Sequence, residues 1–256
     1  MGSPEFHVVI PARMASSRLP GKPLIDLGGK PMIVRVAERA KQSGATSVII
    51  GTDHKDIETA IENAGYEVCL TNSDHRSGSD RVLEVVDQYQ FSDDSIVVNV
   101  QGDEPLIPPA VITQVAVNLT KNSGADLSTL CQTCPVTSEA SDPNIVKVIR
   151  ARTGMALYFS RSLVPHDPNL EFQEQQNTGE TVYRRHIGIY AYWVRTLRKF
   201  VDLPTSELEE RESLEQLRFL ENGFMIGVEE TCESVPAGVD TLEDVKRIRT
   251  ILERNE

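Results

Sequence analysis

The stretch "HVVIPARMASSRLPGKPL", residues 7–24, begins as an apolar strand and continues as a basic loop. The run over 7–12 is typical of a strand covered on both faces of a sheet. The loop after it carries Arg13, Arg18 and Lys22 among small residues, Pro and Gly. Open α/β sheets bind ligands where such loops leave the carboxyl ends of strands. The stretch therefore predicts an α/β fold with a candidate anion site directly after its first strand.

The chain as far as residue 134 repeats this alternation of apolar strands and amphipathic helices. Further strands are predicted over 47–53, 67–72, from 95 and over 125–133, with helices over about 31–44, 56–65, 78–89 and 109–121. This order is typical of a doubly wound, mostly parallel sheet with helices on both faces.

The pattern changes after Pro135. Strands are predicted over 145–151, 156–162 and 186–194. The polar stretch between the last two is either a disordered linker or a long loop that forms a lid or an intersubunit arm. A helix over about 206–222, a strand over 224–230 and a helix from Thr241 complete the chain. Residues 1–6 ("MGSPEF") resemble a linker left by recombinant expression and are left out of the fold prediction.

Composition and charge exclude several classes of function. The formal net charge is −12 at pH 7, which disfavours nucleic acid and anionic lipid as partners. No apolar run approaches the 18 residues of a membrane span. With no signal peptide in the sequence, we expect a cytoplasmic protein. Cys131 and Cys134 form a C-x-x-C pattern, which we interpret as reduced thiols because a zinc site needs a second pair or nearby histidines.

The basic loop differs from the two common phosphate-binding motifs. It contains no G-x-G-x-x-G, and the residue after "GK" is Pro23, where a Walker A loop carries Ser or Thr. Both dinucleotide-dependent oxidoreduction and P-loop hydrolysis are therefore disfavoured. Taken alone, the three basic side chains fit a solvated loop as well as a phosphate site.

Two acidic stretches bear on that choice. "VNVQGDEP" places Asp103 just past an apolar strand, where it is either part of a solvated turn or a ligand for a hard cation such as Mg²⁺. "VPAGVDTLEDV" places Asp240 before the last helix, where the residues alone favour an ordinary N-cap.

Seven pieces of the sequence together resemble one family, 3-deoxy-manno-octulosonate (Kdo) cytidylyltransferase, also called CMP-Kdo synthetase. They run in unbroken order from about residue 7 to 252, and the broader sugar nucleotidyltransferases share only the basic loop and the strand-end aspartate. The pieces are "IPAR…SSRLPGKPL", "TNSDHRSGSDR", "VNVQGDEPLIPP", "ALYFSR", "RRHIGIYAY", "ESLEQLRFLENG" and "GVDT".

The resemblance implies transfer of CMP from CTP to an acidic eight-carbon sugar, Kdo, releasing pyrophosphate, for lipopolysaccharide biosynthesis. The implied catalytic residues are Lys22, Arg13 and Asp103, with Lys22 stabilising charge on the α-phosphate and the departing pyrophosphate. Asp103 and Asp240 are the implied ligands of Mg²⁺. The implied nucleotide-binding residues are Arg13, Ser17, Arg18, Lys22, Ser77, Gly78, Arg81 and Gln101, and the implied sugar-binding residues are Arg161, His186, Tyr190, Glu215 and Gln216.

The resemblance also implies a nucleotide-diphospho-sugar transferase fold and a homodimer. We expect one domain over 7–256, with a nucleotide-binding half (7–134), a smaller strand-rich part for sugar binding and dimerisation (135–205), and a return to the main sheet (206–256). One departure concerns the segment Pro165, His166, Asp167, Pro168 and Asn169, because relatives usually carry an arginine there and this chain does not. The shape of the 166–182 loop and the sugar bound therefore stay open.

Two other functions remain as alternatives. One is another activation reaction within the same fold, with a different nucleotide or a different acidic sugar, such as an amino analogue of Kdo or a sialic acid. The other is a nucleotide-binding module without catalysis, which the presence of Lys22, Asp103 and Asp240 disfavours.

Overall fold

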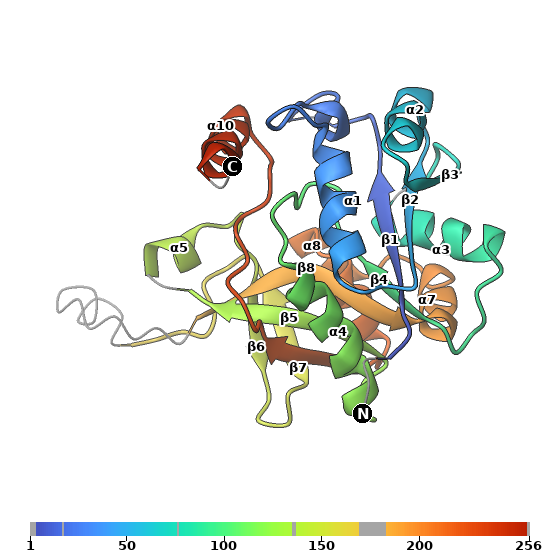
Figure 1. Cartoon of the computed structure of the whole chain (residues 1–256). Helices are drawn as coiled ribbons and strands as arrows, with labels where there is room; N and C mark the ends of the chain where they lie inside the picture. The colour runs from blue at the N-terminus through green and yellow to red at the C-terminus, as the bar shows by residue number, and fades with distance from the viewer. Residues whose placement is uncertain (1–3, 17, 76, 135–136, 169–182, 255–256) are drawn as a thin grey trace.

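A computed structural model describes residues 4–16, 18–75, 77–134, 137–168 and 183–254 of the chain. Its centre is one mixed sheet that runs through both halves of the sequence (Figure 1). The strand order is β3 (Glu67–Leu70), β2 (Ser47–Thr52), β1 (His7–Ala12), β4 (Ile96–Asn99), β8 (Arg184–Trp193), β5 (Leu127–Thr133) and β9 (Ile226–Glu230).

Along this order of seven strands, most neighbours are parallel. β1 pairs in parallel with both β2 and β4, β2 with β3, and β5 with β9. The exception is β8, which is antiparallel to β4 on one side and to β5 on the other. The predicted doubly wound, mostly parallel fold is confirmed, and its parallel strands all end at the same edge of the sheet.

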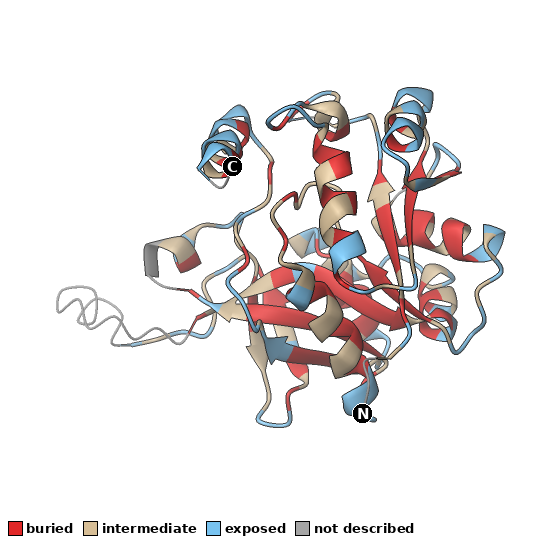
Figure 2. Cartoon of the chain, viewed as in Figure 1, coloured by how far each residue is buried: buried red, intermediate tan, exposed pale blue. Residues whose placement is uncertain are grey.

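Side chains alternate between two hydrophobic cores, one on each face of the sheet. Along β1, Val8 and Ile10 belong to one core while Val9 belongs to the other. Figure 2 shows buried residues concentrated in the strands and on the inward sides of the helices. The first core is covered by α1 (Met32–Gln42), α2 (Lys55–Asn63) and α4 (Pro109–Lys121), and the second by α3 (Gly78–Gln88), α7 (Val194–Val201) and α9 (Gln216–Glu221).

The second half of the chain adds a β-hairpin and a last helix that packs near the end of β1. β6 (Lys147–Arg150) and β7 (Ala156–Ser160) pair antiparallel, and β6 touches β8 at one position. The last helix, α10 (Leu242–Glu253), packs against the segment after β1, because Val245 and Ile248 share a small core with Leu19 and Leu27. Short helices α5 (Thr137–Ser141) and α8 (Glu207–Glu212) lie on the connections.

Two predicted elements of the second half were wrong in detail. The single helix expected over 206–222 is two helices, α8 and α9, because Ser213 between them has a left-handed backbone with φ 52°. The strand expected over 186–194 ends at Trp193, and the chain turns at once into α7, which the sequence analysis missed. None of the helices in the described part of the chain is long and apolar enough to cross a membrane.

Candidate active site

A cavity of about 400 Å³ opens at the carboxyl ends of β1 and β4 and is closed on one side by the start of α3. We call it the strand-end cavity. The sequence-predicted residues that line it come from five separate segments of the chain. They are Arg13, Arg18, Lys22, Ser77, Gly78, Arg81, Gln101, Asp103, Glu215 and Asp240.

Lys22 lies between the two predicted metal ligands. Its Nζ donates to Asp103 Oδ2 at 2.6 Å and to Asp240 Oδ1 at 2.9 Å. Gly21 makes this approach possible, because its φ of 67° starts the 3₁₀ turn Lys22–Leu24 from a backbone region that favours glycine. Burial alone would lower the pKa of the Lys22 ammonium, but the two carboxylates outweigh it and raise that pKa. Lys22 is therefore a fixed positive charge in the cavity.

Asp240 reaches the cavity because a neighbour caps the helix. The N-cap of α10 is Thr241, whose Oγ1 accepts from the Asp244 backbone N–H at 3.2 Å. The N-cap interpretation of Asp240 was therefore wrong, and its carboxylate is left to contact Lys22 and Arg18, the latter at 3.2 Å. The backbone N–H of Val239 donates to the Asp103 carbonyl at 2.9 Å, which ties this segment to the loop after β4.

The donor set of the cavity fits a magnesium ion that also binds substrate. Two carboxylates, Asp103 and Asp240, converge on a single cationic group, the Lys22 ammonium. Within the described ranges, no group of three or more His, Cys, Asp or Glu side chains is arranged to hold a metal ion. Mg²⁺ is usually held by one or two carboxylates together with water and substrate phosphates, rather than by a cage of protein ligands.

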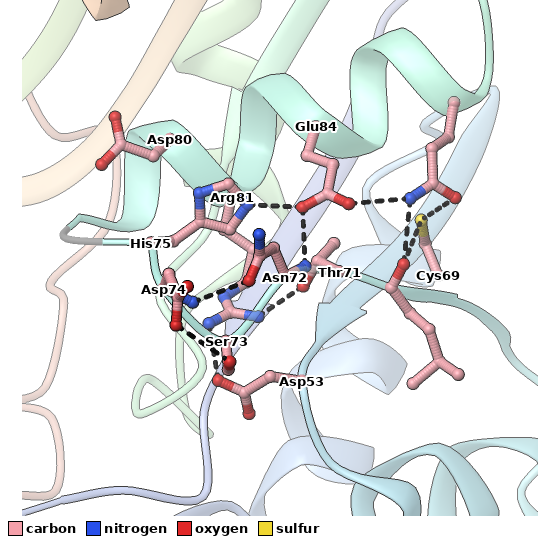
Figure 3. Close-up of polar contacts among 12 residues, drawn as sticks. Asp53, Cys69, Thr71, Asn72, Ser73, Asp74, His75, Asp80, Arg81 and Glu84 are labelled. Atoms are coloured by element: carbon pink, nitrogen blue, oxygen red, sulfur yellow. Dashed lines mark hydrogen bonds and ion pairs between the residues drawn. The ribbon is translucent and has the colours of Figure 1, made fainter.

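The opposite end of the cavity is formed around Arg81 (Figure 3). Arg81 is 3% exposed, and its guanidinium donates to Asp53 at 2.7 Å and to the Thr71 hydroxyl. Ser77 caps α3 by accepting from the Asp80 backbone N–H at 3.1 Å. Gln101 donates to Asn99 at 3.1 Å. This end is rich in polar groups that are already held in place.

Three residues near the cavity were not among the predicted site residues. His75 lines the cavity, and its Nε2 contacts Glu84 of α3. Asp53 holds Arg81 from the end of β2. Glu104 follows Asp103, and burial, with the neighbouring carboxylate of Asp103, raises its pKa to about 8. Asp53 could have been predicted in the same way as Asp103, because it directly follows the carboxyl end of a strand, β2.

Of the predicted sugar-binding residues, Glu215 lines the cavity and the other four do not. Glu215 Oε1 is buried without a hydrogen-bond partner among the described residues. Burial raises the pKa of this carboxyl. Gln216 is buried in the first turn of α9. Arg161 is turned to backbone carbonyls instead, including Glu212 O at 2.7 Å and Pro143 O at 3.1 Å.

His186 and Tyr190 lie together on β8, outside the lining of the cavity. Their ring centroids are 5.4 Å apart. His186 Nε2 lies 2.9 Å from the Thr129 hydroxyl, and burial lowers the pKa of its imidazole to about 3. The imidazole is therefore neutral at physiological pH. Ser17 and residues 169–182, which include most of the 166–182 loop, lie outside the described residues.

The fold and this site define a nucleotidyltransferase, and the family model for Cytidylyltransferase matches residues 7–232. Proteins named 3-deoxy-manno-octulosonate cytidylyltransferase are similar over nearly the whole chain. The one from Yersinia enterocolitica is 51% identical over 248 residues, covering 96% of this chain and 98% of its own. The one from Proteus mirabilis is 52% identical over 240 residues, covering 94% of each. The chain belongs to the family of 3-deoxy-manno-octulosonate cytidylyltransferases.

Solved structures agree with this assignment. A structure of CMP:2-keto-3-deoxy-manno-octonic acid synthetase complexed with CTP superposes with a TM-score of 0.89 at 38% sequence identity, covering 99% of this chain and 100% of the other. A nucleotidyl transferase from Methanothermobacter thermautotroptrophicus gives a TM-score of 0.64 at 17% identity over 98% and 99% of the two chains. At that identity the likeness concerns the fold alone.

Proposed function

We propose that the chain couples CTP with Kdo and yields CMP-Kdo and pyrophosphate, as a step of lipopolysaccharide biosynthesis. The observation that carries the proposal is the convergence of Lys22, Asp103 and Asp240 at one edge of the sheet. A structure similar to this chain binds CTP, and similar proteins are named for the reaction.

The charges along the cavity support one orientation of the nucleotide. Arg13 and Arg18 are exposed and line the cavity, and Arg18 and Lys22 both contact Asp240. A triphosphate fits the Asp240 side of the cavity, where these cations neutralise charge that grows on the α-phosphate and on pyrophosphate as it leaves. The base then lies toward Arg81, Ser77 and Gln101.

Asp103 and Asp240 are the residues that would hold Mg²⁺ in this reaction. When bound, the ion would supply Lewis-acid stabilisation of phosphate charge and make a sugar hydroxyl a better nucleophile. The chain's own residues bind and orient: the exposed arginines hold the triphosphate, and Lys22 stabilises the charge that develops. Glu215 has a buried oxygen with no hydrogen-bond partner among the described residues, and is suited to accept a hydrogen bond from a sugar hydroxyl.

Pyrophosphate release with each of the four nucleoside triphosphates, in the presence of Mg²⁺ and Kdo, tests the proposal. We expect product with CTP at a rate at least tenfold above the other three. The proposal would be overturned if none of the four nucleotides gave pyrophosphate with Kdo or with any other acidic sugar. CTP binding without any pyrophosphate release would instead identify a nucleotide-binding module.

A different acidic sugar is the second candidate. The observation that favours it is the missing arginine in the segment 165–169, which follows β7. The same assay with an amino analogue of Kdo and with a sialic acid separates the two candidates by their kcat/KM.

We also propose a homodimer in the cytoplasm. Leu157 of β7 is 60% exposed on a hairpin at the margin of the sheet, which suits contact with a second copy. The four cysteines are free, and Cys131 and Cys134 are fully buried, which suits a reducing compartment. Small-angle scattering would give the mass of a dimer, and a monomer at micromolar concentration would contradict the first part.

A further inference from the structure

The strand-end cavity has two differently charged ends, and the order of strands in the sheet separates them. Asp103 follows β4, while Asp53 and Thr71 follow β2 and β3 on the far side of β1. Near Asp103, the side chain of Arg18 faces solvent and that of Lys22 bridges two carboxylates. Arg81, in contrast, is buried and already neutralised at the β2 and β3 side.

Two side chains hold the guanidinium of Arg81 in place (Figure 3). Asp53 Oδ2 accepts from Nη2 at 2.7 Å, and the Thr71 hydroxyl accepts from Nη1. Gly51 of β2 faces the aliphatic stem of Arg81, and a Cβ added there would come within 2.8 Å of Val85 Cγ2 and 3.4 Å of Arg81 Cγ. Only a residue without a side chain leaves room for α3 to carry Arg81 this close to the sheet.

An arginine held in this way serves a neutral ligand better than a phosphate. The Asp53 carboxylate balances its charge, so it adds little to the attraction of a triphosphate. A guanidinium has five N–H donors in a planar fork, and the two contacts leave others for a ligand. In cytosine, N3 and O2 are neighbouring acceptors that can both accept from a guanidinium. In uracil, N3 carries an N–H donor, which cannot form a hydrogen bond with a guanidinium N–H.

We propose that Asp53 is a positioning residue for recognition of the base, acting through Arg81; this rests on the proposed function, in which CTP is the substrate. Asp53 and Thr71 hold the guanidinium so that its remaining donors face the acceptor edge of cytosine and disfavour uracil. The residue does not touch the reacting atoms, and the phosphate end of the cavity works independently of it.

The test compares binding of CTP and of UTP by titration calorimetry, and steady-state transfer, for the wild type and Asp53→Asn. We expect the variant to bind CTP about tenfold or more weakly and to lose most of its preference over UTP. Its KM for CTP should rise by a similar factor while kcat changes less than about twofold, because Lys22 and Asp103 are untouched. Asp56→Asn is the matched control, since Asp56 is an exposed neighbour that pairs with His54. It should bind both nucleotides like the wild type.

Two further variants keep the inference testable if Asp53→Asn fails to fold with an unpaired buried arginine. Arg81→Gln removes that charge, and the double variant Asp53→Asn with Arg81→Gln should show the same CTP and UTP affinities as Arg81→Gln alone. Additive losses in the double variant, or an Asp53→Asn protein with unchanged CTP preference, would overturn the inference. Calorimetry needs no turnover. If the wild type binds CTP but releases no pyrophosphate, the proposed function fails, and the CTP and UTP affinities of the variants still test the role of Asp53.

Discussion

At the residue scale, the site depends on one lysine that meets carboxylates from two distant segments. Lys22 contacts Asp103 and Asp240 because a left-handed glycine, a strand end and a capped helix start deliver all three to one edge of the sheet. The meeting of Lys22 and Asp103 was predictable in outline, since the carboxyl ends of parallel strands lie together. Only the family resemblance indicated that Asp240 joins them. The cap was not predictable, because Asp240 and Thr241 are both good N-cap residues and only the backbone geometry chooses between them.

Asp103→Asn should abolish turnover and leave the fold intact. The change keeps the shape of the side chain but removes the negative charge that faces Lys22 and would bind Mg²⁺, so we expect a loss of about a hundredfold or more in kcat, about 2.7 kcal/mol of transition-state stabilisation. Pyrophosphate release and thermal unfolding measure the two parts. Asp202→Asn, at an exposed position after α7, is the control. Wild-type turnover in Asp103→Asn would remove this carboxylate from the mechanism.

At the scale of elements, α3 organises the loop after β3. Glu84 accepts from the Asn72 backbone N–H at 2.8 Å and contacts His75, and one turn later Gln88 donates to Glu84 at 3.1 Å and to the Leu70 carbonyl at 2.9 Å. α3 itself was predictable from its apolar spacing and its Ser77 start. These contacts were not, because the loop has no periodic pattern, which is also why His75 was missed.

The contacts of Glu84 with His75, Asn72 and Gln88 should make the free energy of unfolding depend on pH in the acidic range. Burial alone would raise the pKa of Glu84, but hydrogen bonds from His75, Asn72 and Gln88 prevail and lower it. A carboxyl with a lowered folded pKa stabilises the protein above its unfolded pKa, about 4.3, and loses that contribution as the pH falls through the folded pKa.

Chemical denaturation between pH 6 and pH 3 measures this effect. The wild type should lose more of its free energy of unfolding over that range than Glu84→Gln does, because glutamine cannot titrate. Glu58→Gln, which breaks an ion pair of α2 with Lys55, is the control and should follow the wild type. An equal acid dependence in the wild type and Glu84→Gln would contradict the prediction.

Helix boundaries in the second half show where pattern reasoning stops. The residues of α8 and α9 share one apolar spacing, so the sequence predicts a single helix. The break at Ser213 follows from tertiary contacts, since Glu212 is held by the Ser160 hydroxyl at 2.6 Å and by the Arg161 backbone N–H at 2.9 Å. Such contacts join residues more than fifty positions apart and leave no local signal.

At the scale of the whole molecule, β8 joins the two halves of the chain into one sheet. It is the longest strand among those described, with ten residues, and although it belongs to the second half it lies between β4 and β5, two strands of the first half. Both cores include its side chains, Ile187 and Ala191 on one face and Tyr190 and Tyr192 on the other. The sheet therefore has no boundary at which one half could unfold alone.

The chain should consequently unfold in a single cooperative transition. Far-ultraviolet circular dichroism and tyrosine fluorescence should give the same denaturation midpoint, and the calorimetric and van't Hoff enthalpies should agree. The variant Ala191→Asp, which buries a charge at the centre of β8, should lower both midpoints together. Two separated transitions in the wild type would show that the halves are independent.

The hydrogen bond between Val239 and the Asp103 carbonyl has a consequence for biosynthesis. At about 5–20 residues per second, the ribosome adds Asp240 on the order of 10 s after Asp103. During that interval the strands β5 to β9 are added to a nascent polypeptide that contains only one of the two acidic partners of Lys22. We therefore expect no transfer activity from a product of premature termination upstream of Val239, because it lacks one of the two acidic partners of Lys22.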